Sequence, residues 1–119
     1  MSISVQDLFS EVALDFGVRE SSERFRSKFL YKVNSVLSDI TADTFYDTTP
    51  VSSITDTLDL ADHFYDVIRT GLQWKMQESG EYGREPDTRV LAKYGAILGR
   101  LQSKYFEENG VDNLSGKPL

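Results

Sequence analysis

The sequence contains no cysteine, and its only histidine is His63. The lack of cysteine excludes disulfides, thiolate metal sites and cysteine nucleophiles. A single imidazole without cysteine partners does not make a typical zinc site, so we expect no metal or other cofactor. His63 is therefore predicted to be a structural or surface residue rather than a catalytic one.

Long apolar runs and a surplus of basic residues are also missing. No stretch approaches the roughly 20 apolar residues that cross a bilayer, and the first residues lack the basic start and apolar stretch of a signal peptide. We therefore expect no membrane partner and a cytoplasmic location. The 13 Lys and Arg residues are outnumbered by 19 Asp and Glu residues, for a net charge of −6. This balance disfavours nucleic acid as the main partner but leaves room for a local basic patch.

Recognisable catalytic and cation-binding motifs are absent. The sequence has no G-x-S-x-G elbow and no phosphate-binding glycine loop after a strand. Its aspartates do not follow the spacing of a calcium loop, which ends on a bidentate glutamate. We expect these carboxylates to cap helices and turns, and we expect the protein not to be an enzyme.

What the sequence does contain is helical periodicity. Its 119 residues, 39% of them hydrophobic, suit one domain with one core. Apolar residues spaced three or four apart predict a mainly α, small four-helix bundle over residues 1–110, followed by a flexible tail at 111–119. The predicted helices cover about 4–17, 22–39, 60–77 and 88–108.

Residues that start and stop helices support these boundaries. Ser4 is the predicted N-cap of the first helix and Gly17 its end. Either Ser21 or Ser22 caps the second. Pro86 introduces the fourth, which Asp87 or Thr88 caps and Gly110 ends.

The segment between the second and third helices differs in composition. From Val33 to Ile68 there is no Lys or Arg, but there are seven aspartates. We predict an extended acidic loop or short β-hairpin over about 41–58 that projects from the helical body, with Tyr46 and the 51–54 stretch pairing around Pro50. A loop this long in a small domain suggests a functional role, and the alternative is a plain solvated connection.

The last predicted helix carries two interior glycines. Leu91 and Tyr94 belong to its apolar face, whereas Gly95 and Gly99 lie on a second face roughly 140° away. Each glycine costs on the order of 1 kcal/mol relative to alanine, so we expect a neighbouring element to approach this smooth face closely. That neighbour is either the third helix, where Gly71 would be the counterpart, or another copy of the chain. The aromatic end of the helix at 105–106 is a further candidate for such a contact.

A basic stripe lies on the second predicted helix, where Arg24, Lys28 and Lys32 are four residues apart. Together with the acidic loop it would make the molecule electrically two-sided. In a ring, a basic edge that meets an acidic edge is a head-to-tail contact that closes the circle. The simpler alternative is a solvated helix face.

Several sequence segments, taken together, resemble the head-tail connector (adaptor or head-completion) proteins of tailed bacteriophages. They are Phe-Leu-Tyr-Lys-Val-Asn-Ser-Val-Leu at 29–37, the polar loop with Pro50, the run from Leu58 through 64–72, and a last helix with Tyr94 and Tyr105. The resemblance implies a helical bundle that forms a ring beneath the portal at the virion neck and has no catalytic activity. It also implies that the partners are further copies of the chain and the portal and tail-completion proteins, that DNA is only passing cargo, and that assembly takes place in the host cytoplasm.

We accordingly expect a set of residues at subunit or partner contacts. They are Arg24, Lys28, Lys32, Tyr46, Pro50, Val51, Gly71, Gly95, Gly99 and Tyr105. Two other classes remain open. One is a small helical protein-binding or regulatory module without enzymatic activity, and the other is a helix-turn-helix protein whose basic stripe faces DNA.

Overall fold

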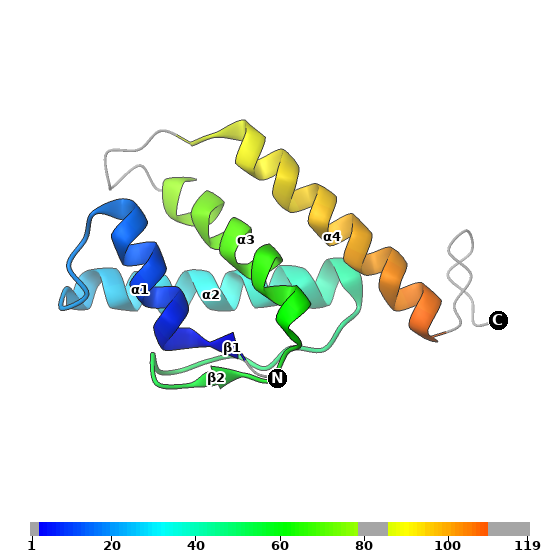
Figure 1. Ribbon diagram of the computed structural model, residues 1–119, viewed down its shortest axis with the longest axis horizontal. Coiled ribbons are helices and arrows are strands. Elements are labelled where there is room, and N and C mark those ends of the chain that lie inside the picture. Colours follow the sequence, from blue (N-terminus) through cyan, green and yellow to red (C-terminus); the bar gives the residue numbers. More distant parts are fainter. Residues whose placement is uncertain (1–2, 79–85, 110–119) are drawn as a thin grey trace.

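A computed structural model describes residues 3–78 and 86–109, and within them the chain folds as a small helical bundle (Figure 1). This confirms the predicted mainly α, four-helix architecture. Its elements are β1 (Ile3–Ser4), α1 (Val5–Phe16), α2 (Glu23–Thr44), β2 (Thr57–Leu58), the 3-10 turn η1 (Asp62–Phe64), α3 (Tyr65–Glu78) and α4 (Thr88–Asn109). Figure 1 shows α2 running along the bundle, with α3 between α1 and α4.

Short polar side chains begin the first two helices as predicted. The Ser4 hydroxyl accepts a hydrogen bond from the Asp7 N–H at 3.2 Å, and Gly17 ends α1 in the left-handed conformation, with φ 65°. For α2 the cap is Ser22, whose hydroxyl accepts from the Phe25 N–H at 3.2 Å. These bonds satisfy backbone donors that the first turn of a helix leaves without partners.

Other boundaries differ from the prediction. The second helix continues past residue 39 to Thr44, because Ile40 and Thr44 are fully buried and tertiary packing outweighs the low helix propensity of threonine. The third helix starts at Tyr65 rather than residue 60, after the turn η1. The start of the fourth helix agrees with the prediction, since it begins at Thr88 and the Asp87 carboxylate accepts from the Arg89 N–H at 2.9 Å. The predicted end at Gly110 and the predicted tail at 111–119 lie outside the described residues.

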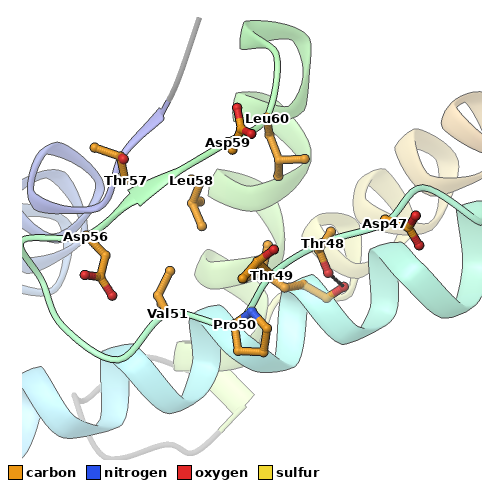
Figure 2. A pocket seen from close by; sticks show the side chains of 11 residues that line it. Asp47, Thr48, Thr49, Pro50, Val51, Asp56, Thr57, Leu58, Asp59 and Leu60 are labelled. Atoms are coloured by element: carbon orange, nitrogen blue, oxygen red, sulfur yellow. Dashed lines mark hydrogen bonds between the residues drawn. The ribbon is translucent and has the colours of Figure 1, made fainter.

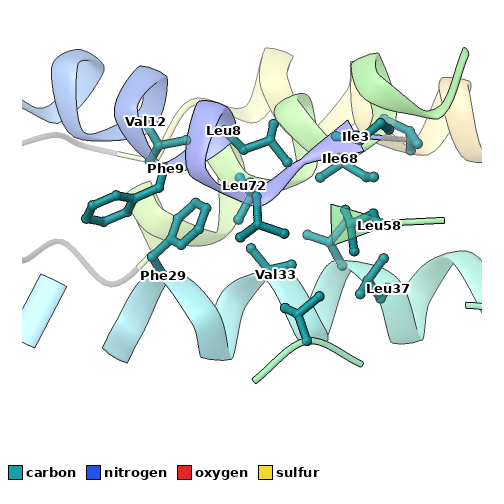
Figure 3. Close-up of a cluster of buried hydrophobic side chains, with 14 of the residues drawn as sticks. Ile3, Leu8, Phe9, Val12, Phe29, Val33, Leu37, Leu58, Ile68 and Leu72 are labelled. Atoms are coloured by element: carbon teal, nitrogen blue, oxygen red, sulfur yellow. The ribbon is translucent and has the colours of Figure 1, made fainter. Parts of the chain in front are cut away.

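One hydrophobic core joins the helices and the loop segment (Figure 3). Phe9 of α1 packs against Phe25 and Phe29 of α2, with ring centroids 5.6 and 5.2 Å apart. All three rings are buried, and complete burial of a side chain of this size stabilises a fold by about 1.5–3 kcal/mol. Leu72 of α3 is fully buried in the same core, so α1, α2 and α3 share it.

The predicted projection of the acidic loop is wrong. Segment 45–61 lies along the bundle, with Val51, Ile54 and Leu58 buried in the common core. The Asn34 side chain of α2 holds it, since its amide nitrogen donates to the Val51 carbonyl at 2.9 Å and its amide oxygen accepts from the Val51 N–H at 2.8 Å. The Thr48 hydroxyl also donates to the Leu37 carbonyl at 3.0 Å.

The strand pairing is also different from the predicted one. Instead of a hairpin around Pro50, β2 pairs antiparallel with β1 at the start of the chain, with Ile3 opposite Leu58. Both of these side chains are buried, which favours this register. A hairpin strand at Val51 is not available, because the Asn34 side chain already occupies both of its backbone hydrogen-bonding groups.

Candidate interaction surfaces

The contact between α3 and α4 depends on Gly71. A Cβ atom at this position would lie 2.7 Å from Cε1 of Tyr94, closer than real Cβ contacts come, and 3.0 Å from Cγ2 of Val36. The prediction that Gly71 marks a close helix contact is therefore confirmed, and the contact lies within one chain. Because Tyr94 and Val36 already fill the space at Gly71, this position has no room for a side chain or for a contact with another subunit.

A polar network beside this contact joins α2, α3 and α4. Oδ2 of Asp39 accepts from the Tyr94 hydroxyl at 2.9 Å and forms an ion pair with the Lys75 ammonium at 3.0 Å. Burial, followed by the negative charge of Asp39, raises the pKa of Tyr94 above its ordinary value. The tyrosine thus remains a neutral hydrogen-bond donor well into the alkaline range.

The two interior glycines of α4 behave differently from Gly71. A Cβ atom at Gly95 or Gly99 would meet nothing within 4 Å, and both residues are exposed. The expected approach of the third helix to these glycines is therefore wrong. The buried residues of α4 are instead Tyr94, Ile97, Leu98 and Leu101.

A smooth, exposed strip of α4 results. Leu91, expected on the apolar face, is 43% exposed. We name this strip the α4 outer face, and its members are Leu91, Ala92, Gly95, Ala96 and Gly99. No described residue covers it at the glycines.

The acidic segment forms a groove of about 590 Å³ beside α2 (Figure 2). We name it the loop groove. It is lined by Leu37, Asp47, Thr48, Thr49, Pro50, Val51, Asp56, Thr57, Leu58, Asp59 and Leu60. Figure 2 shows residues 47–51 along one side and 56–60 along the other. The predicted contact residues Pro50 and Val51 both line this groove, although Val51 is buried and only Pro50 is exposed.

A tight turn gives one end of the groove its shape. The Asp56 carboxylate accepts hydrogen bonds from the N–H groups of Ser52 at 2.9 Å and Ser53 at 3.0 Å. Both bonds lower the pKa of the Asp56 carboxyl below its usual value, and the bond from Ser52 contributes most. Asp56 thus has a structural role, whereas Asp47 and Asp59 are exposed at the groove.

Aromatic side chains gather where α2 ends beside α4. The rings of Tyr46 and Tyr105, both predicted contact residues, lie 5.1 Å apart edge to face. Phe45, which is not among the predicted contact residues, packs against Tyr105 and Phe106, with its ring centroid 5.9 Å and 5.5 Å from theirs. It is 48% exposed and takes a left-handed φ of 69°, which is uncommon for a residue other than glycine.

A hydrogen bond fixes this aromatic end. The Tyr46 hydroxyl donates to Oε2 of Glu108 at 2.8 Å. Burial, together with this bond to Glu108, raises the pKa of Tyr46 to about 12. The adjacent aromatic pair at 45–46 was the sequence signal that could have identified the cluster.

The predicted basic stripe lies on the first half of α2, away from the groove. Arg24 is exposed, and Lys28 and Lys32 are half-buried. The Lys32 ammonium lies 5.8 Å from the ring centre of Tyr31, a side chain that is 72% exposed. The stripe is thus a partly packed helix surface with an exposed tyrosine beside it.

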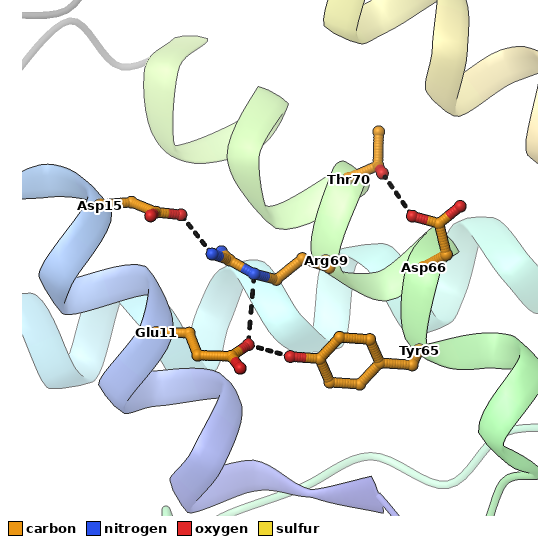
Figure 4. A network of polar contacts seen from close by, with 6 residues as sticks. All are labelled: Glu11, Asp15, Tyr65, Asp66, Arg69 and Thr70. Carbon is orange, nitrogen blue, oxygen red and sulfur yellow. Dashed lines mark hydrogen bonds and ion pairs between the residues drawn. The ribbon is translucent and has the colours of Figure 1, made fainter.

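A second polar network ties α1 to α3 (Figure 4). The Arg69 guanidinium forms ion pairs with Glu11, at 3.3 Å, and with Asp15. The Tyr65 hydroxyl donates to the same Glu11 carboxylate. Because the carboxylates lie on α1 and their partners on α3, this network stabilises the helix contact, and no sequence motif pointed to it.

Residues 3–78 and 86–109 contain neither a metal-binding cluster nor a membrane-spanning helix. There, no three His, Cys, Asp or Glu side chains come together as a metal site would require. His63 is exposed and packs against the neighbouring Phe64, with ring centroids 4.5 Å apart. The helices in these ranges are too short or too polar to traverse a bilayer.

No protein-family model, curated protein or solved structure compared with this chain matches it. The resemblance to head-tail connector proteins therefore stays a prediction from the sequence. The surfaces of the described chain that could meet a partner are the α4 outer face, the loop groove, the aromatic end and the basic stripe.

Proposed function

We propose that this protein is a structural subunit of the neck of a tailed bacteriophage, assembling into a ring that links the portal and head to the tail. The observation that carries the proposal is the placement of unlike surfaces on two sides of α2. Asn34 and Thr41 bond to the loop segment, whereas Asp39 and Asp43 bond to α4. At 3.6 residues per turn, Asp39 and Asp43 point about 140–180° away from Asn34.

The two sides also carry opposite charge. Between Thr88 and Phe106, α4 has four Lys or Arg residues and no carboxylate, whereas the segment from Val33 to Ile68 has seven aspartates and no Lys or Arg. A subunit with complementary surfaces on opposite sides associates head to tail, and such a contact gives a ring when the rotation between copies closes.

The net charge of −6 on the whole chain also suits a protein through which DNA passes. A surface that bears carboxylates repels the phosphate backbone, so DNA slides along it instead of binding. In this proposal the ring contacts the portal on one side and tail-completion proteins on the other, DNA is passing cargo, and no catalytic step is required of the subunit.

Native mass spectrometry of the purified chain, from low micromolar to near-millimolar concentration, tests the proposal. We expect one closed species of fixed copy number that dissociates when salt is raised to about 1 M, because screening then shortens the range of charge attraction to roughly 3 Å. A dimer that does not grow with concentration, or an open-ended series of oligomers, would contradict a ring.

The aromatic end favours a second candidate, a small helical protein-binding module. Partly exposed aromatic residues anchor many protein interfaces, and Phe45 combines 48% exposure with an uncommon backbone conformation. In this case the chain stays monomeric at every concentration, and Phe45→Ser abolishes binding to the partner while circular dichroism shows an intact fold. A self-associating chain that is indifferent to Phe45→Ser would argue against the module.

A further inference from the structure

We infer that the α4 outer face of one copy docks on the loop groove of the next copy. The inference rests on the proposed ring assembly and names the two surfaces that would meet in it. Both surfaces are accessible in the described chain, and they bond to different sides of α2, the loop segment through Asn34 and α4 through Asp39.

The α4 outer face is shaped for close contact. With no side chain at Gly95 and Gly99 and only methyl groups at Ala92 and Ala96, another backbone can approach the helix directly. The two glycines lie about 6 Å apart along the helix, at 1.5 Å per residue. Leu91, one turn before Gly95, adds an exposed apolar side chain to the same strip.

Basic side chains flank this strip on one side. Lys93 and Arg100 are seven residues apart, so they point within about 20° of each other and lie roughly 10 Å apart along the helix. Lys93 makes one long ion pair, at 3.7 Å, with Asp66 of its own chain. Arg100 is exposed, and it is the cation best placed to reach a second molecule.

The loop groove offers the matching features. Its apolar lining, to which Pro50 and Leu60 contribute, suits an aliphatic side chain such as Leu91. Its exposed carboxylates, Asp47 and Asp59, suit the flanking cations. At about 590 Å³ it holds a few side chains rather than a whole helix, which fits a helix that lies across it and inserts only part of one face.

Charge complementarity identifies the occupant as a second copy of this chain. The groove lies in a segment without any Lys or Arg, and the α4 surface lies in one without any carboxylate until Glu107. Neither surface is complementary to itself, so two grooves or two α4 faces would repel each other. The contact is therefore heterologous, and each copy uses one surface of each kind.

Site-specific cross-linking tests this contact, and the absence of native cysteine makes it clean. We would prepare a Ser103→Cys chain, which keeps Gly99 intact because the change is one turn further along α4, and a Thr49→Cys chain, both at exposed positions, and join them with a short bis-maleimide. The expected product is a dimer of one Ser103→Cys chain and one Thr49→Cys chain, well above the yield of either homodimer. Gln6→Cys, exposed on α1, replaces Thr49→Cys as the control for random collisions.

Charge reversal identifies the basic surface. Arg100→Glu should reduce the Ser103–Thr49 cross-link at least about tenfold, since a tenfold change corresponds to 1.4 kcal/mol and opposed like charges cost more than this. Lys32→Glu makes the same charge change on the α2 stripe and should leave the yield unchanged. A loss caused by Lys32→Glu but not by Arg100→Glu would overturn the inference in favour of the stripe.

The remaining outcomes separate this inference from the proposed function. Cross-links only between identical positions, or none between Ser103 and Thr49 while native mass spectrometry shows closed rings, would overturn the docking mode and leave the ring. A chain that carries both cysteines should give a ladder of products that stops at the ring size. A strictly monomeric chain without any of these cross-links would overturn both.

Discussion

Two regions of the molecule use glycine in opposite ways. Gly71 of α3 is buried under Tyr94, where a Cβ atom would lie 2.7 Å from a ring carbon, whereas Gly95 and Gly99 of α4 face open space. Each is an interior helical glycine and bears the same propensity cost of about 1 kcal/mol. At Gly71 the fold itself offsets this cost. At the α4 outer face no contact within the described chain offsets the cost, which suggests that a contact with another molecule does.

The largest effect should come from a methyl group at Gly71. We expect Gly71→Ala to lower the free energy of unfolding by about 2 kcal/mol, because the buried Tyr94 ring must shift and this overpacking exceeds the gain in helix propensity. Urea denaturation followed by circular dichroism measures it. An unchanged midpoint would show that α4 moves away without cost and would remove the contrast with Gly99.

The second prediction separates packing from hydrogen bonding at the same contact. Tyr94→Phe should lower the free energy of unfolding by about 1.5 kcal/mol, since it removes the hydrogen bond to Asp39 and keeps the ring.

This variant also has a pH signature. The raised pKa of Tyr94 means that its stabilising contribution is complete below the ordinary tyrosine pKa of about 10 and declines as the pH rises above it. Denaturation at pH 8 and pH 11 should show a smaller alkaline loss for Tyr94→Phe than for the wild type. An equal loss in both would assign the alkaline effect to other groups.

A smaller effect of opposite sign is expected on the α4 outer face. Gly99→Ala should raise the free energy of unfolding by about 0.5–1 kcal/mol, because the position is helical and the new methyl group meets nothing. It is the matched control for Gly71→Ala, and both are measured in the same urea titration. Destabilisation by Gly99→Ala would mean that the face is covered in the isolated chain.

The smallest effect concerns the turn at Asp56. Because its pKa is lowered in the folded chain, its contribution is present above the ordinary aspartate pKa of about 3.9 and is lost as the pH falls through the folded value. The protection of the Ser52 and Ser53 amides against hydrogen exchange, relative to the unfolded chain at the same pH, should therefore fall on acidification below pH 4. Asp56→Asn should weaken this dependence, and Asp59→Asn should not.

The sequence predicted the helices well because their apolar spacing and caps are local signals. Ser4, Gly17 and the apolar residues of α1 specify a helix almost by themselves. The loop was mispredicted because its many aspartates and threonines indicate solvent. Val51, Ile54 and Leu58 become buried only when the segment packs into the common core beside α2, and no local sequence pattern reveals that packing.

The site was predictable only in part, for a similar reason. The sequence marks Gly71, Gly95 and Gly99 alike, and only the packing of Tyr94 shows which of them lacks room for a side chain. The pairing of β1 with β2 joins residues more than fifty positions apart over two residues each, too short for any periodicity to reveal. Tyr46 and Tyr105 were both identified as contact residues, but their contact with each other needed the fold.

The bonds between Asn34 and the Val51 backbone have a chemical consequence. The Asn34 side chain presents one donor and one acceptor, as a neighbouring strand would, so a single amide substitutes for a sheet edge. Deamidation to aspartate replaces the donor with a second acceptor, which would then face the Val51 carbonyl and repel it. The attachment of the acidic segment, and with it the shape of the groove, thus depends on one side-chain amide remaining chemically intact as the protein ages.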